Sequence, residues 1–178
     1  ATSRRAPTPG HQWHLGLGLA ALAKRPMAAT PLTGAGVSLF VAGSLTWWLS
    51  AHYSRNDMLV SPSSARFGFG GLVLGVGPPA VDFGPRLRVA AALAAEGAFV
   101  TAEGVNVDVE LSAKRSYWAA GALGRVQFKV ASHAGIFLEL GGFVPLIERR
   151  FSTREPYELV GRTARFAAQG ALGLALSL

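Results

Sequence analysis

The chain has 178 residues, of which 50% are hydrophobic and only 15% are charged, and its formal net charge is +7. Average soluble domains carry roughly 25% charged residues, so this composition is unusual for one. Cysteine is absent, which excludes disulfides and cysteine-ligated metal sites. The basic residues are spread along the chain, so we expect them to meet anionic lipid headgroups and we predict no nucleic-acid-binding patch.

The first segment, residues 1–10, is polar and contains two prolines, which predicts a linker or a processed N-terminus. No secretory signal is visible, so we expect a mature or trimmed chain. The sequence leaves open whether a periplasmic domain precedes it.

Eight later segments alternate apolar residues with small or polar ones, which is the pattern of β-strands between two different environments. They are residues 11–22, 34–41, 44–54, 64–76, 86–100, 116–130, 134–147 and 166–178. In the fourth segment we assign Phe67, Phe69 and Val73 to the outward, apolar face, which leaves Leu72 and Leu74 on the inner face.

Residues 26–51 contain no charged side chain and are long enough to cross a bilayer as a single helix. The stretch is rich in Gly, Thr, Ser and Val, however, and it alternates on both sides of Ala42-Gly43. This pattern favours two strands joined by a tight turn.

The last segment places Leu172, Leu174, Leu176 and Leu178 on one face and runs to the final residue. A long apolar edge strand in water invites aggregation, whereas a closed barrel in lipid has no edge. We therefore predict an all-β protein, an eight-stranded antiparallel up-and-down transmembrane β-barrel over residues 11–178. The rival fold is a soluble lipocalin-like barrel, with the apolar phase inside and the charged phase outside.

The connections between the predicted strands alternate in length, as in bacterial barrels with short periplasmic turns and longer outer loops. The longer, outer connections are residues 23–33, 55–62, 101–115 and 148–162, and the inner ones are residues 42–43, 77–84 and 131–133. Residues 105–111 also alternate, and we assign them to an outer loop because a ninth full strand would break the even count.

Aromatic residues are predicted to form two lipid-facing girdles, one at each membrane interface. The members of this aromatic girdle are Trp13, Tyr53, Phe67, Phe99, Trp118, Phe128 and Phe166. Trp13 and Phe128 fall near the inner ends of their strands and the others near the outer ends. The alternative is that they are ordinary core aromatics of a soluble barrel.

The inward phase holds mostly small residues together with a lumen charge network, whose predicted members are Arg86, Arg88, Glu96, Arg125, Lys129, Glu139 and Arg165. Charges inside a barrel must be paired or hydrated, and an eight-stranded barrel is just wide enough for side chains to fill. We therefore expect a lumen plugged by side chains, with Glu139 between the strands that carry Arg125 and Arg165. The alternative is a narrow channel lined by the same residues.

Over residues 11–178 the pattern resembles the small eight-stranded outer-membrane barrels of Gram-negative bacteria, such as the OmpA-type transmembrane domain and the outer membrane protein β-barrel domain families. Gly173, Leu176 and Leu178 match part of the terminal signal that the barrel-assembly machinery reads, although Leu178 replaces the usual aromatic residue. The resemblance implies an integral protein of the bacterial outer membrane. Its expected partners are outer-membrane lipids and lipopolysaccharide, the barrel-assembly machinery, and a surface or periplasmic protein.

No metal-ligand spacing or phosphate-binding loop is present, so no cofactor and no catalytic residue is predicted. Some small barrels are lipid-modifying enzymes, and such an enzyme would bring His52 against a serine or a carboxylate. We expect instead a solvated histidine at the outer rim, near Ser50, Ser54 and Asp57 in sequence. The predicted role is structural, anchoring or surface interaction, with a lipid-modifying enzyme or a narrow channel as alternatives.

Overall fold

The computed structural model describes residues 14–27, 31–60, 63–105, 112–148, 150–152 and 159–177. Eight long strands make up most of these residues: β1 (His14–Met27), β2 (Leu32–Ala42), β3 (Thr46–Val60), β4 (Ser63–Gly77), β6 (Leu87–Val105), β7 (Ser112–Lys129), β8 (Ala134–Pro145) and β10 (Leu159–Ser177). Two short strands, β5 (Val81–Phe83) and β9 (Arg150–Ser152), accompany them.

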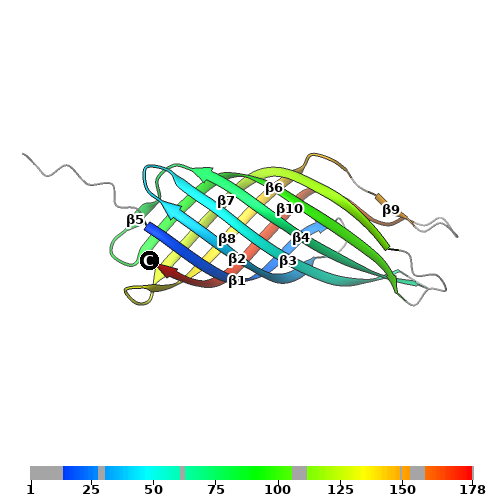
Figure 1. Ribbon diagram of the computed structural model, residues 1–178, viewed down its shortest axis with the longest axis horizontal. Coiled ribbons are helices and arrows are strands. Elements are labelled where there is room, and N and C mark those ends of the chain that lie inside the picture. Colours follow the sequence, from blue (N-terminus) through cyan, green and yellow to red (C-terminus); the bar gives the residue numbers. More distant parts are fainter. Residues whose placement is uncertain are drawn as a thin grey trace, which may run out of the picture.

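The eight long strands form one closed antiparallel barrel (Figure 1). Their order is β1-β2-β3-β4-β6-β7-β8-β10, so each long strand pairs with the next long strand in the chain. The barrel closes where β1 pairs with β10, in a register that places Leu17 opposite Leu176. The apolar last strand is therefore a wall strand with a partner on both sides, as the sequence predicts.

The two ends of the barrel differ. The C-terminus and β5 lie at one end, here called the inner end, and β9 lies near the other, the outer end (Figure 1). β5 folds back along β6, with Val81 opposite Val89. Gly84, at a φ of 70°, follows β5 in the turn back into β6, and glycine adopts such a φ without the steric cost that other residues meet. The unusually long inner connection is thus a folded segment.

At the outer end, two hairpins extend further than the sequence predicts. β3 and β4 remain paired up to Val60 and Ser63, and β6 and β7 reach Val105 and Ser112. The prediction of a loop over residues 55–62 was wrong for residues 55–60, which belong to β3, because the polar residues there lack the apolar alternation by which strands are recognised. Residues 61–62 lie outside the described residues. The greater part of the alternating segment 105–111 lies outside the described residues.

The described residues of the segment 26–51, which are 26–27 and 31–51, form strands and a turn and not a single helix. They cover the end of β1, all of β2 and the start of β3, and the turn is closed by a hydrogen bond from Gly43 N to Leu45 O of 3.0 Å. In the part of the chain that the structure describes, no helix is long and apolar enough to cross a membrane.

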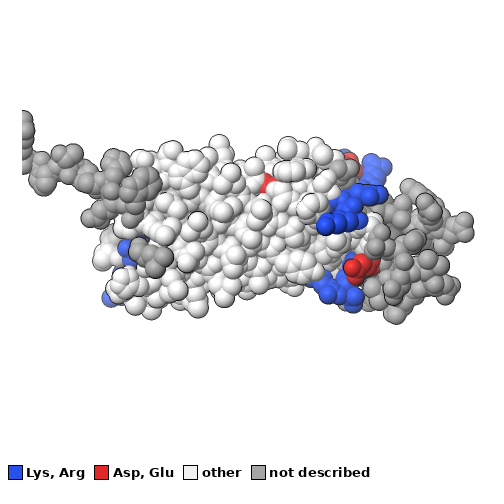
Figure 2. Space-filling view, viewed as in Figure 1, with Lys and Arg blue, Asp and Glu red and all other residues white. Residues whose placement is uncertain are grey.

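The two faces of the barrel wall differ sharply in chemistry. Trp47 is 45% exposed on the outside, whereas its neighbour Trp48 is fully buried in the lumen. The exposed face carries large apolar residues along every long strand, and Figure 2 shows an outer surface almost free of charge between two charged ends. This is the outward apolar phase that the sequence predicts.

The orientation of β4 was predicted wrongly. Phe67, Phe69 and Val73 are buried inside the barrel, whereas Leu72 and Leu74 are more than half exposed on the outer face. Both alternating sets of this strand are apolar, so periodicity alone cannot orient it. The interior takes the aromatic set because Phe69 packs there between His52 and Tyr117, with ring centroids 5.6 and 5.0 Å away.

Candidate functional site

The interior of the barrel is crossed by three polar contacts, and each joins strands on opposite walls. Lys24 of β1 forms an ion pair with Glu96 of β6. In the closed order of eight strands, β1 and β6 are four positions apart, which is the full diameter of the barrel. The same separation relates β3 to β8 and β2 to β7, which supply the other two contacts.

The first contact is the centre of a buried cluster. The side chains of Lys24 and Glu96 are fully buried, and His52 Nε2 of β3 lies 3.1 Å from Glu96 Oε1. Lys24 Nζ also donates to Gln169 Oε1 over 3.3 Å. Its ammonium lies 4.8 Å from the centroid of the Phe69 ring, a distance at which an aromatic face attracts a cation.

The second and third contacts involve Glu139 of β8 and Arg125 of β7. Trp48 Nε1 donates to Glu139 Oε2 over 3.0 Å, and Arg125 Nη1 donates to Ser38 Oγ over 3.4 Å. The guanidinium carbon of Arg125 lies 3.8 Å from the centroid of the Phe137 ring. Aromatic faces and hydroxyl groups thus surround charges that would be costly to bury alone.

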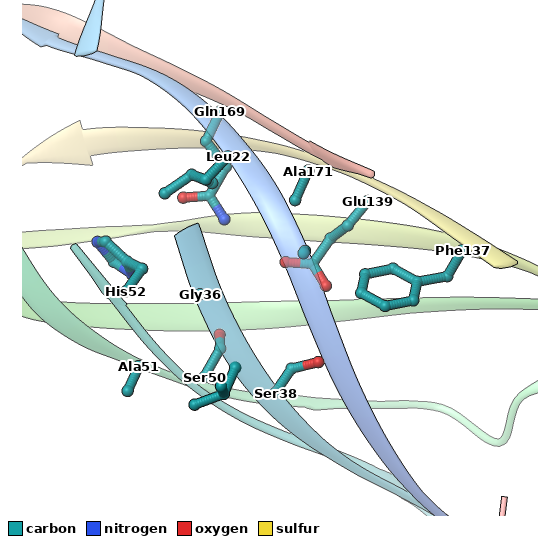
Figure 3. A pocket seen from close by; sticks show the side chains of 12 residues that line it. Leu22, Gly36, Ser38, Ser50, Ala51, His52, Phe137, Glu139, Gln169 and Ala171 are labelled. Atoms are coloured by element: carbon teal, nitrogen blue, oxygen red, sulfur yellow. The ribbon is translucent and has the colours of Figure 1, made fainter. Parts of the chain in front are cut away.

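Little space remains between these contacts. A cavity of about 20 Å³ lies between the clusters, which is room for about one water molecule. Figure 3 shows His52, Gln169 and Glu139 reaching into this region from different strands, with Ser38 and Ser50 nearby. Several buried polar atoms have no hydrogen-bond partner among the described residues: Thr46 Oγ1, Ser54 Oγ, Glu96 Oε2, Tyr117 OH, and Arg125 Nε and Nη2.

Of the predicted lumen charge network, Glu96, Arg125 and Glu139 are buried. Glu139 is the cross-strand partner of Arg125, and it also accepts the hydrogen bond from Trp48 on the opposite wall. Lys129 is half-buried near the end of β7.

Two members of the predicted network are exposed and not buried in the lumen. Arg86 is exposed because it belongs to the turn after β5, and not to a strand. Arg165 is exposed because the pairing of β1 with β10 is irregular there: Arg25 pairs with Ala168, but Met27 pairs with Thr163. The extra residues in β10 break the alternation, so Arg165 is exposed although Thr163 and Ala167, two positions away on either side, are buried.

Arg88 is buried at the inner end, where it pairs with a residue of β5. Its Nε and Nη2 donate to the two carboxylate oxygens of Asp82 over 2.7 and 2.9 Å. Hydrogen bonding from Arg88 lowers the pKa of Asp82 below its usual value, despite partial burial of the carboxyl group. This bidentate pair fastens β5 to β6.

Sequence reasoning missed Lys24, which contacts a carboxylate, an amide and aromatic faces in the interior. The first predicted strand ended at Leu22, so Lys24 fell into an expected loop. The inward phase of β1 in fact continues as Gly18, Ala20, Leu22 and Lys24. An extension of the period-two pattern by two residues would have found it.

Most described members of the predicted aromatic girdle are exposed. Tyr53, Phe99, Trp118, Phe128 and Phe166 are 46–60% exposed on the outer face. Phe67 is an exception, since it is 2% exposed and lies inside with the rest of its strand face. Trp13 lies outside the described residues.

His52 was predicted to be a solvated rim residue, and this was wrong. β3 continues to Val60, so His52 lies mid-strand, faces the lumen and is buried. It contacts a carboxylate, as the enzyme alternative requires, but Glu96 is already paired with Lys24 and is fully buried. Among the described residues, no cluster of three or more potential metal ligands occurs.

No family model and no curated protein matches the sequence. Solved structures do match the fold. A major outer membrane protein from Thermus thermophilus has a TM-score of 0.65 at 10% identity, over 94% of this chain and 100% of that one. Ail, the attachment invasion locus protein of Yersinia pestis, in complex with the heparin analogue sucrose octasulfate, has a TM-score of 0.57 at 11% identity, over 93% and 97%. Neisserial surface protein A has a TM-score of 0.51 at 8% identity, over 92% and 96%. The chain therefore has the fold of the small eight-stranded outer-membrane β-barrels.

Proposed function

We propose that this chain is an integral barrel of the bacterial outer membrane with a structural, anchoring or surface-interaction role and a lumen plugged by side chains. The observation that carries the proposal is the set of three polar contacts across the lumen. Because each joins opposite walls, any continuous conduit must pass all three, and the cavity lined by His52, Glu139 and Gln169 has room for about one water molecule.

The outer surface supports insertion into a membrane. Leu93, Leu140 and Leu174 are 58–74% exposed, and equivalent residues on the other strands form a continuous apolar band. Exposed aromatic residues such as Trp118 and Phe166 lie toward the outer end of this band. In water such a surface would promote association, whereas in lipid it is the favoured one.

The outer end supports the interaction role, because polar hairpins extend there beyond the apolar band. Lys and Arg side chains gather around this end in Figure 2. Exposed members among the described residues are Arg55, Lys114, Arg115, Arg150, Arg162 and Arg165. A basic rim of this kind attracts anionic molecules at the cell surface.

Refolding in detergent and conductance in a planar bilayer test the proposal. We expect a heat-modifiable band on a gel for protein folded in detergent, no folding in plain buffer, and no ion conductance. Folding in plain buffer would overturn the membrane assignment. Steady conductance that changes when Arg125 or Glu139 is neutralised would replace the plugged lumen by a narrow channel.

A further inference from the structure

A row of residues crosses the outer ends of four neighbouring strands on the outward face. The Cα partners are Arg55 of β3 with Gly68 of β4, Gly68 with Thr101 of β6, and Thr101 with Lys114 of β7. Neighbouring strands are ~4.8 Å apart, so the two cationic residues are about 14 Å apart along the sheet. Two small residues occupy the space between them.

The centre of this row is hollow. A cavity of about 50 Å³ lies there, and its lining residues are Tyr53, Arg55, Arg66, Gly68, Thr101 and Glu103. A Cβ on Gly68 would lie 2.5 Å from Thr101 Oγ1 and 3.3 Å from Tyr53 OH. Any side chain at this position would therefore fill the hollow, so its existence depends on glycine at position 68.

The charges around the hollow favour an anion. Arg55, Arg66 and Lys114 supply three positive charges, against the two acidic residues Asp57 and Glu103 that pair with Arg66 from the strands on either side. Arginine presents several N–H donors in a fork that matches a phosphate group. The Thr101 hydroxyl donates to Gly68 O over 3.4 Å, so the arginines supply the donors here.

The surface below the hollow, toward the inner end, is apolar. Tyr53 and Phe99 are 57% and 55% exposed at its edge, and beyond them Leu72, Leu74 and Leu93 are 57%, 56% and 74% exposed. A ligand that satisfied both parts would carry an anionic headgroup with acyl chains running down the wall. A free anion would satisfy the hollow alone.

We propose that this hollow binds a phosphate group of an outer-leaflet glycolipid. Arg55 contacts the phosphate, Arg66 of β4 and Lys114 of β7 add positive charge, and the acyl chains lie along the leucines of β4 and β6. This inference rests on the proposed location in the outer membrane, and it assigns one lipid to one place on the barrel.

The test is binding of bis-phosphorylated lipid A to the refolded full chain in detergent micelles, measured by native mass spectrometry. The double variant R55Q/K114Q should bind about 10- to 100-fold more weakly, because charge-assisted contacts to phosphate are lost. The control R150Q/R165Q removes the same charge from outer-end residues outside this row and should bind like the parent chain. Glu103→Gln should bind more tightly, since a negative charge beside the phosphate is removed.

Fully dephosphorylated lipid A supplies the second comparison. The parent chain should bind it as weakly as R55Q/K114Q binds the phosphorylated form. Equal affinity of the parent chain for both lipids, or an equal loss in the control variant, would overturn the proposal. Displacement of lipid A by millimolar inorganic phosphate would also overturn it, because the hollow would then recognise the anion alone. A heat-modifiable band that persists in R55Q/K114Q keeps this outcome separate from a failure of the membrane assignment.

Discussion

Replacing Lys24 with methionine removes the charge that spans the barrel but keeps most of the side-chain volume. Glu96 would then be a fully buried carboxylate without its main counter-ion. Breaking a buried ion pair by removing one partner costs about 3–5 kcal/mol. His52 Nε2 remains 3.1 Å from Glu96, so we expect a loss of about 3 kcal/mol, at the lower end of that range.

The double variant K24M/E96Q tests whether this loss comes from the unpaired charge. It removes both charges at nearly constant volume, and replacing a buried pair by neutral groups is often close to neutral. We expect the double variant to lose about 1 kcal/mol or less. The two substitutions should therefore be coupled by about 2 kcal/mol or more, within the range seen for residues in contact.

The assay is urea unfolding of the refolded protein in lipid vesicles, followed by the fluorescence of its four tryptophans. Lys114→Met is the matched control, because Lys114 is exposed at the outer end of β7 and surface substitutions usually stay within about 0.5 kcal/mol. The reasoning is refuted if Lys24→Met unfolds like the parent chain, or if the losses of the two single variants simply add in K24M/E96Q.

Three further predictions concern the wall and the inner end. Gly121→Ala should lower the free energy of unfolding by about 1–3 kcal/mol, because its Cβ would collide with a backbone carbonyl. Gly124→Ala on the same strand is the control, since its Cβ would meet only one atom, 4.0 Å away. Equal losses for the two variants in urea unfolding would contradict this prediction. Hydrogen bonding from Arg88 lowers the pKa of Asp82, so the contact that holds β5 is present at neutral pH and is lost as the pH falls through that lowered pKa. The NMR shifts of the β5 amides should follow this titration in acid, and Asp82→Asn should abolish it. Brominated lipid chains should quench Trp47 and spare Trp48 in single-tryptophan variants, because only Trp47 of the two faces outward; quenching of both would reject the assigned faces.

The eight-stranded fold and the outward face of most strands could be predicted because lipid imposes a strict requirement. Outward residues in the band must be apolar, so a period-two pattern is visible wherever the inward residues are small or polar. In β10, Leu172, Leu174 and Leu176 alternate with residues that face the lumen. This requirement acts on one residue at a time and needs no knowledge of partners.

Beyond the lipid-facing band, outward residues no longer need to be apolar, and the strands there were predicted less accurately from the sequence. The outer hairpin of β3 and β4 continues through polar residues up to Val60, so its strands were predicted too short. Arg165 was assigned to the lumen because a strict alternation was assumed across an irregular pairing with β1. A bulge arises from pairing between strands, which one strand's pattern does not record.

The sequence by itself thus determined the class of the barrel, its closure and which residues of most strands face outward. Only the tertiary structure decided the orientation of β4 and the partners inside the lumen. Both alternating sets of β4 are apolar, so the choice depended on whether Phe69 could pack beside His52. Lys24 and Glu96 are 72 residues apart and meet only because closure places β1 opposite β6. Contacts across a diameter depend on the positions of all eight strands at once, and no local pattern encodes them.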